Sequence, residues 1–307
     1  MTQAKTTIII FITLSLFSLQ CKQGLPKLKG FAIEKTGDSW FIKNYPCKAP
    51  QNEQFNKLVG IGKISININI SYDKNSKEKL QCLNSLEGIK NQVVEIKISQ
   101  NKHQKKRNLR AVMNETYARI IKSKFNNLER IRSDFGISDK ALIQLSQLKK
   151  LVVLKLPSFY GVGSQGLSAI GKMRTLAVLS LNLQKNTQVK SLKRLNHLSS
   201  LIISCSCNDV GPISFLTQLT NLEVNSRATN FSSFKKLFKL EKLKITSPLN
   251  NLRFLKNMRF LKKLDISNTQ IKDLTPLKNL KKLVVVNIKN LKIKNLSAIS
   301  HVAQIIK

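Results

Sequence analysis

Leu264 to Leu283 reads LDISNTQIKDLTPLKNLKKL, and the spacing of its apolar residues indicates the fold. The first interval, from Leu264 to Ile266, is two residues, as in a strand with one buried face. From Ile271 onward the intervals are three residues, which is typical of one face of a tight helical or 3₁₀ segment. Because the two-residue alternation restarts at Val286, the stretch predicts one unit of a repeat, a short strand followed by a short helical segment.

The same unit recurs along the chain at nearly constant intervals. When the first apolar residue of each strand is taken as a marker, the intervals are 25, 22, 21, 21, 21 and 22 residues. A single unit leaves its apolar face uncovered, so the units must stack and share one core. The markers are Leu154, Leu179, Leu201, Leu222, Leu243, Leu264 and Val286.

The segment from Leu261 to Leu283 resembles the internalin-like class of bacterial leucine-rich repeats, whose pattern is LxxLxLxxNxIxDLxPLxxL. Thr269 stands where that class has an inward-facing Asn. The resemblance covers about Leu83 to Ile305 and implies an α/β solenoid, a curved leucine-rich repeat. Its parallel β-sheet would lie on the concave face and its short helical or 3₁₀ segments on the convex face. The matching residues are Leu261, Leu264, Ile266, Ile271, Asp273, Leu274, Pro276 and Leu277.

Three regions are expected along the chain. Residues 1–20 form a signal peptide, and residues 21–80 form a tether and a small β-rich N-terminal cap that covers the open end of the solenoid. The period-2 stretch KISININI, from Lys63 to Ile70, predicts a strand of this cap. Residues 81–307 form the repeat domain, irregular to about 140 and regular after it. It begins with a strand at Val93 and contains a helix around Glu115 to Lys124.

The N-terminus predicts export. Lys5 precedes the apolar run from Ile8 to Leu19, which is too short to span a bilayer but is typical of a signal-peptide core. Cys21 follows directly, which resembles the lipobox of bacterial lipoproteins, where that Cys carries the lipid. We therefore expect a lipid-anchored protein of the bacterial cell envelope, in the outer membrane or on the surface. A periplasmic or secreted protein, or an uncleaved chain, is the alternative.

The charge of the chain indicates anionic partners or a biased composition. The 307 residues contain 53 Lys and Arg against 16 Asp and Glu, a net charge of +37, in a sequence also rich in Asn and Ile. Nucleic acid is a poorer fit, because aromatic residues are few and no DNA- or RNA-binding module is present. One basic cluster resembles a heparin-binding pattern, with a solvated loop as the alternative. Its residues are Lys102, Lys105, Lys106, Arg107 and Arg110.

The resemblance implies a binding scaffold without catalytic residues or cofactor, which presents its concave face to a protein or glycan ligand, as in an adhesin. The alternative is a structural envelope protein whose basic outer surface lies on anionic lipid or polysaccharide. The residues that alternate with the core in each strand are mixed in charge, which places most of the positive charge elsewhere. They are Lys155, Pro157, Ser180, Asn182, Ile202, Ser204, Glu223, Asn225, Lys244, Thr246, Asp265, Ser267, Asn287 and Lys289.

The cysteines leave several arrangements open. Export permits a disulfide between Cys47 and Cys82, and two separate thiols are the alternative. Cys205 and Cys207 flank Ser206, which falls at the inward Asn position of its repeat, so both thiols are expected to point away from the core. A local disulfide, an intermolecular disulfide and free thiols all fit this placement.

Motifs for chemistry are nearly absent. Gly161 to Gly166 matches GxGxxG, but a dinucleotide site needs an acidic residue about 20 positions later, and residues 175–190 contain none. The glycine run is therefore interpreted as the loop that lengthens the first regular repeat. His103, His197 and His301 fall in different repeats, without a second ligand at metal spacing, so we expect no metal site.

Overall fold

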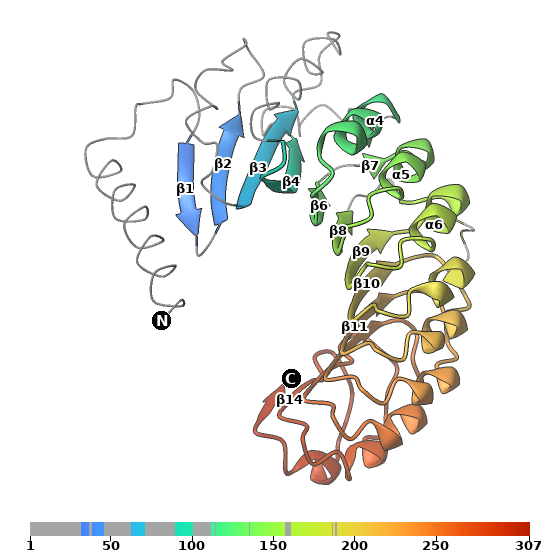
Figure 1. The fold of residues 1–307 in the computed structure, drawn as a ribbon. Coiled ribbons are helices and arrows are strands. Elements are labelled where there is room, and N and C mark those ends of the chain that lie inside the picture. The colour runs from blue at the N-terminus through green and yellow to red at the C-terminus, as the bar shows by residue number, and fades with distance from the viewer. Residues whose placement is uncertain are drawn as a thin grey trace, which may run out of the picture.

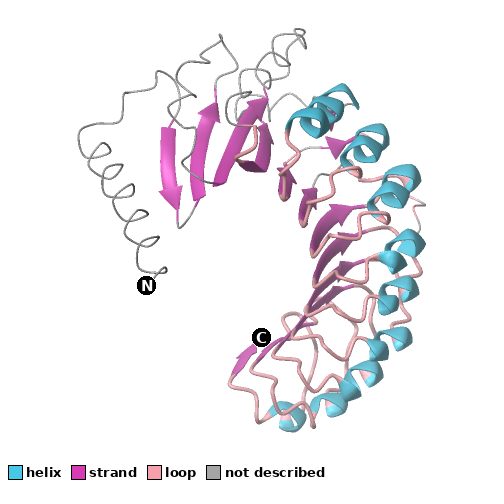
Figure 2. Cartoon of the chain, in the orientation of Figure 1, coloured by secondary structure: helices cyan, strands magenta, loops and turns pink. Residues whose placement is uncertain are grey.

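The chain forms an arc of stacked repeats in the computed structural model, with one long sheet on the inner side and helices on the outer side (Figures 1 and 2). This architecture confirms the predicted leucine-rich-repeat solenoid. The structure describes residues 32–36, 39–45, 63–70, 90–100, 112–113, 115–134, 136–156, 161–185, 187 and 189–307.

Thirteen of the described strands form the main sheet. Its strands are parallel except for β1, which pairs antiparallel with β2 at one end, and β5 (Val112–Met113) pairs with β7 (Gly136–Ile137) in a separate two-stranded sheet. The strands of the main sheet are, in order, β1 (Ala32–Thr36), β2 (Ser39–Tyr45), β3 (Lys63–Ile70), β4 (Val93–Gln100), β6 (Arg130–Ser133), β8 (Val153–Leu156), β9 (Val178–Asn182), β10 (Ser200–Ser204), β11 (Asn221–Asn225), β12 (Lys242–Thr246), β13 (Lys263–Asp265), β14 (Val285–Asn287) and β15 (Gln304–Ile306).

The outer side changes character along the arc, from α-helices to 3₁₀ helices. The predicted helix at Glu115–Lys124 is α4, and no helix among the described residues is long and apolar enough to cross a membrane. The helices that follow are α5 (Asp139–Leu145), α6 (Ser164–Ile170), and the 3₁₀ helices η3 (Val189–Arg194), η4 (Gly211–Phe215), η5 (Ser232–Lys236), η6 (Arg253–Asn257), η7 (Thr275–Leu277) and η8 (Ser297–Ile299).

The sheet register confirms the repeat markers. Leu179 pairs with Leu154 on one side and with Leu201 on the other, and the same alignment continues from marker to marker as far as Val286 and Ile305. It also extends back to Ile66, in β3, through β4 and β6. The stretch Lys63–Ile70 is therefore a strand, as predicted, and it continues the repeat sheet in parallel with β4.

The core is a continuous ladder of aliphatic side chains between the sheet and the outer helices. In the repeat that starts at Leu243, the side chains at alternate positions, Leu243 and Ile245, and those at later steps of three, such as Leu252 and Leu255, are almost completely buried. Three Phe rings widen the core under η5 and η6. The ring of Phe231 lies 5.1 Å from that of Phe234 and 6.0 Å from that of Phe254, measured between centroids.

The predicted position of the inward polar residue is wrong by one residue in several repeats. Period-2 alternation continues past the strand, so Ser226 and Ser247 face inward, and their Oγ atoms lie 2.9 Å apart. Gln184 and Arg227 lie five residues after their own markers, as Thr269 does after Leu264, and both are exposed. The Leu264 and Val286 repeats are shifted, because Asn268 and Asn290 adopt positive φ values of 59° and 67°; in the Leu264 repeat this adds one residue before buried Thr269.

The same shift corrects the prediction for the two adjacent cysteines. Ser206 is exposed, whereas Cys205 and Cys207 are half-buried, pack against the core and form a disulfide with each other. Both cysteines occupy the positions taken by Ser226 and Ala228 in the next repeat. The thiols therefore do not point away from the core, because the alternation of the strand runs on through them.

Candidate functional site

The concave face is built from strand residues that alternate with the core. The predicted residues form two columns across neighbouring strands, in which Ser180 pairs with Ile202 and Ile202 with Glu223, while Asn182 pairs with Ser204. The structure adds a third column that the sequence interpretation missed, because each strand begins one residue before its marker. That column contains Arg130, Val153, Val178, Ser200, Asn221, Lys242, Lys263 and Val285.

Apolar side chains occupy the middle of this face. Val153 and Val178 pair across β8 and β9 and are half-buried, and Ile202 on β10 leaves 37% of its surface exposed. We call these three residues the concave apolar strip. Its neighbour Ser180 is small and buried, and Lys155, in register with Ser180, is half-buried. Lys155 and Ser180 therefore place polar side chains beside the strip.

An ion-paired cluster lies on the N-terminal side of the concave apolar strip. Glu95, on β4, is only 8% exposed. One of its carboxylate oxygens lies 2.7 Å from Nε of Arg132, and the other lies 4.0 Å from Nη1 of Arg130 and accepts a hydrogen bond from Ser65 Oγ at 3.3 Å. Both arginines remain partly exposed toward the concave side.

A second ion-paired cluster lies on the C-terminal side of the concave apolar strip. Lys244 Nζ donates to Glu223 Oε1 at 2.6 Å, and this hydrogen bond raises the pKa of Lys244 against the opposing effect of burial. Asp265, the next residue in this column, accepts hydrogen bonds from the Ser267 hydroxyl at 2.7 Å and from the Ser267 amide at 3.0 Å. Charges therefore compensate one another locally, in agreement with the mixed composition predicted for this face.

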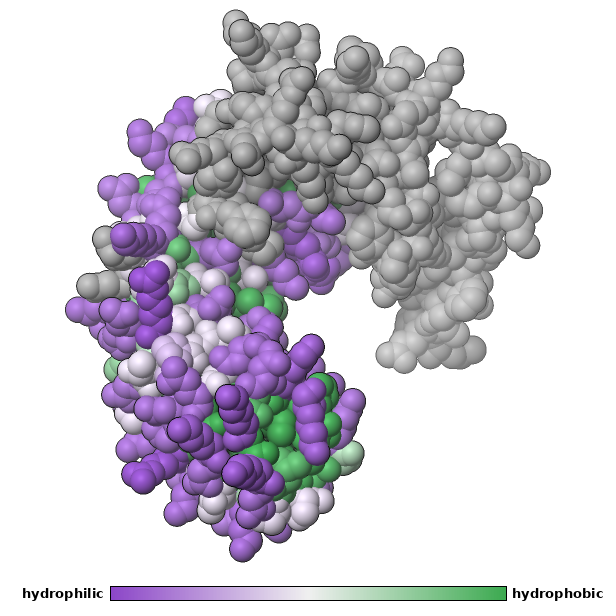
Figure 3. Space-filling model, turned by 180° about the vertical axis from the view of Figure 1, so that it is seen from behind, coloured by the Kyte–Doolittle hydropathy of each residue, from purple (hydrophilic) through white to green (hydrophobic). Residues whose placement is uncertain are grey.

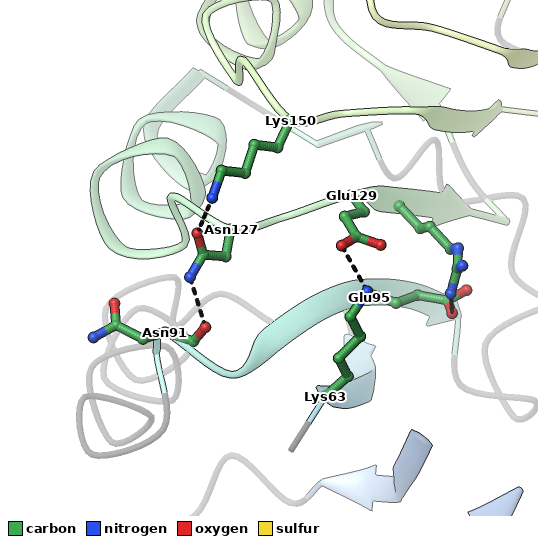
Figure 4. Close-up of polar contacts among 7 residues, drawn as sticks. Lys63, Asn91, Glu95, Asn127, Glu129 and Lys150 are labelled. Carbon is green, nitrogen blue, oxygen red and sulfur yellow. Dashed lines mark hydrogen bonds and ion pairs between the residues drawn. The ribbon is translucent and has the colours of Figure 1, made fainter. Parts of the chain in front are cut away.

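Polar side chains at the edge where the strands begin connect neighbouring repeats. Lys150 Nζ donates to Asn127 Oδ1 at 2.7 Å, and Asn127 Nδ2 donates in turn to the carbonyl of Asn91 at 2.8 Å (Figure 4). Lys63 Nζ lies 3.0 Å from Glu129 Oε1. Because each of these groups already has a partner in the adjacent repeat, this edge is better explained by stacking than by ligand binding.

The glycines of the GxGxxG match take part in packing between repeats. Gly161 and Gly163 precede α6 and Gly166 lies within it; a side chain at Gly161 would overlap the backbone of Leu183. The amide of Gly163 donates to Asp139 Oδ1 at 2.9 Å, so it is not available to a phosphate. Among the described residues, no three His, Cys, Asp or Glu side chains gather as metal ligands would.

Several predicted site residues lie outside the described residues, and they stay predictions. They are Cys21, Cys47, Cys82, Lys102, Lys105, Lys106, Arg107, Arg110 and Pro157.

The fold and the repeat register define the class, a leucine-rich-repeat protein. Residues 259–301 match the family described as Leucine Rich repeats (2 copies). Among solved structures, the chain is similar to an internalin, inlF, from Listeria monocytogenes, with a TM-score of 0.57 and 17% identity over 80% of this chain and 72% of that chain. No curated protein matches the chain in sequence.

Receptor ectodomains share the same fold. The LRR ectodomain of the Arabidopsis receptor kinase HAESA, solved in complex with an IDA peptide hormone, gives a TM-score of 0.54 with 17% identity, over 78% of this chain and 40% of that chain. The PEPR1–AtPEP1 structure gives a TM-score of 0.51 with 16% identity, over 76% and 34% respectively. At these identities the similarity establishes the fold alone.

Proposed function

We propose that this chain is a non-enzymatic binding protein of the bacterial cell envelope, anchored through a lipid on Cys21, which recognises a protein or peptide on its concave face as an adhesin would. The similar HAESA structure holds a peptide ligand, which supports a peptide or protein as the class of ligand. The similar internalin supports a bacterial setting.

One observation carries the proposal. The concave apolar strip lies between the Glu95 cluster and the Glu223–Lys244 pair, and it exposes Ile202 to solvent at the centre of the face. Protein interfaces commonly combine an apolar centre with a polar rim that excludes water from it. The strip therefore supplies contact area, and the polar groups of the two clusters supply hydrogen-bond donors and acceptors at its rim, which orient a partner.

A peptide selection tests the concave site. A random-peptide phage library is selected on the immobilised protein, and the selected peptides are then measured against Ile202→Asp. A carboxylate in the apolar centre should weaken binding at least about tenfold, which is the size expected at an interface hot spot. Ile143→Asp is the matched control, because Ile143 is similarly exposed, at 40%, but lies on α5 at the outer side. Equal binding to both variants would exclude the concave face.

The lipid anchor has its own test. Cells that express the chain are labelled with radioactive palmitate, with Cys21→Ala as the comparison, and intact cells are treated with protease. We expect label on the wild type alone and removal of the protein by the protease. An unlabelled wild type that resists the protease would contradict both the anchor and the surface location.

A further inference from the structure

Two adjoining recesses lie on the outer side of the arc, between α6 and η4. One, of about 510 Å³, is lined by residues of α6 and η3, and the other, of about 780 Å³, continues toward Phe215 of η4. The two recesses share Lys193 and Arg194. We call this pair of recesses the outer groove. It faces away from the concave apolar strip, since η3 and η4 lie on the convex side of the solenoid (Figure 2).

The outer groove has a high density of uncompensated positive charge. Residues 140–208 contain ten Lys and Arg and no Asp or Glu. Five of these basic residues line the two recesses, and none of the five forms an ion pair with a carboxylate in the described part of the chain. They are Lys172, Arg174, Lys190, Lys193 and Arg194.

Carboxylates are present in the repeats that follow, and some lysines there are paired. Lys262 Nζ lies 2.8 Å from Glu241 Oε2, and Lys244 pairs with Glu223 on the concave face. Like charges that crowd a recess repel one another unless an anion binds between them. The absence of carboxylates at the outer groove therefore leaves a site with a preference for a ligand that carries several negative charges.

The walls of the outer groove indicate the chemistry of the ligand beyond its charge. The ring of Phe215 is 56% exposed at one end of the groove, beside the amide of Asn196 and the imidazole of His197. The hydroxyls of Ser164 and Ser168 lie at the other end. An exposed ring offers a flat apolar face to a sugar ring, and amide and hydroxyl groups match sugar hydroxyls. A recess also fits a single chain better than the flat surface of a bilayer.

We propose that the outer groove binds a linear anionic polysaccharide, with its sulfate or carboxylate groups on the five basic side chains and a sugar ring against Phe215. Lys236 Nζ lies 5.4 Å from the centroid of the Phe215 ring, which places a further positive charge beside the proposed sugar contact. The site is separate from the concave face, so the protein can hold a polysaccharide and a protein ligand at once.

Heparin is the probe, and matched charge reversals locate its site. Lys193→Glu with Arg194→Glu reverses two charges in the outer groove. Lys256→Glu with Lys278→Glu is the control, because it makes the same change in net charge on the same side of later repeats. Lys256 and Lys278 lie eight residues before the markers Leu264 and Val286, just as Lys193 lies eight residues before Leu201. We expect the groove variant to weaken heparin binding about tenfold or more in 0.15 M salt, and the control variant to change it less than about threefold.

The competing explanations predict other outcomes. Equal weakening by both double variants would show that net charge, not the outer groove, binds heparin, and this would overturn the proposal. Phe215→Ala should weaken heparin more than inorganic polyphosphate, since only heparin has rings to contact; an equal loss would also overturn it. Tighter groove-dependent binding of single-stranded DNA, or of phosphatidylglycerol vesicles, than of heparin would assign the groove to another class of ligand. Circular dichroism of each variant checks the fold.

Discussion

The repeats before Leu201 and those after it build the same solenoid in two ways. The first set places α4, then α5 and α6, of seven residues each, and last the six-residue 3₁₀ helix η3 on the outer side, while the second set uses only 3₁₀ helices, of three to five residues. An α-helix rises about 1.5 Å per residue and a 3₁₀ helix about 2.0 Å, so seven α residues and five 3₁₀ residues both span about 10 Å. Repeats of 21 residues can therefore match the height of the 25-residue repeat, and the sheet register continues unbroken.

The two sets also differ in how the outer segments begin. In the second set, an Asp or Asn side chain accepts a hydrogen bond from the amide two residues later, just before each 3₁₀ helix, so the turn is specified locally. In the first set, α5 has a local cap, because Ser138 Oγ accepts the amide of Ala141 at 3.2 Å, but before α6 the amide of Gly163 is bound by Asp139 of the preceding repeat, so that turn depends on stacking. The residues that form the local turns are Asp209, Asn230, Asn251, Asp273 and Asn295.

Removing a large core side chain should lower the stability of the protein more than any other substitution considered below. Phe234 is fully buried between Phe231 and Phe254, so Phe234→Ala should lower the free energy of unfolding by about 3–5 kcal/mol. Because repeats contact only their neighbours, the loss should be local. Hydrogen exchange should show faster opening around η5 and continued protection of β8 and β9. Equal loss of protection at β8 would show that the two sets unfold as one unit.

Gly161→Ala tests the dependence of the first set on stacking. The added methyl group would overlap the backbone of Leu183 in the next repeat, which cannot rotate away, so we expect a loss of about 1–3 kcal/mol in denaturant unfolding. Gly211→Ala is the control in the second set, because the methyl group there meets mainly the carboxylate of Asp209, a movable side chain. Similar losses in both variants would remove this distinction between the two sets.

Most of the fold could be predicted from the sequence, because the markers are also the residues that pair across the sheet. Leu201 and Leu222, for example, are 21 residues apart and directly in register. The inward polar position could not be predicted in the same way. The family pattern places the inward polar residue five residues after the marker. The alternation of the strand places it four residues after the marker, unless a residue with positive φ, such as Asn268, adds one residue. Ser206 was misplaced for that reason.

The binding surfaces were less predictable than the fold. If each strand starts at its marker, Val153 and Val178 are left out of the concave face. Extending the period-2 alternation by one residue toward the N-terminus includes both of them. The shape of the outer groove depends on the packing of η3 between α6 and η4. The lack of Asp and Glu in residues 140–208 indicates the charge of the groove but not its shape. The turn residues recur every 21 or 22 positions, yet the family pattern contains Asp alone, so Asn230 and Asn251 were not recognised.

Asn230→Ala tests the local turns of the second set. The Oδ1 atom of Asn230 accepts the amide of Ser232 at 2.9 Å, and loss of such a cap costs about 0.5–2 kcal/mol. Asn230→Asp keeps the acceptor and should retain the stability of the wild type at neutral pH. The comparison uses the midpoint of urea unfolding for the three proteins. If the alanine variant unfolds at the wild-type midpoint, the side chain does not specify the turn.

The smallest effect should be a pH dependence carried by Asp273 and absent from the Asn turns. Hydrogen bonds from the Thr275 side chain and then from its amide, at 2.8 Å, lower the pKa of Asp273 below its ordinary value of 3.8. Since the folded pKa is below the unfolded one, the stabilisation is present above about pH 4 and is lost as the pH falls through the folded pKa.

Asp273→Asn should therefore reduce the slope of stability against pH between about pH 5 and 2.5. Asn230→Asp should increase that slope, because it gives the η5 turn a carboxylate with the same hydrogen bond. Urea unfolding of both variants across this range decides the point, and parallel curves for all three proteins would mean that the turn carboxylate does not respond to folding.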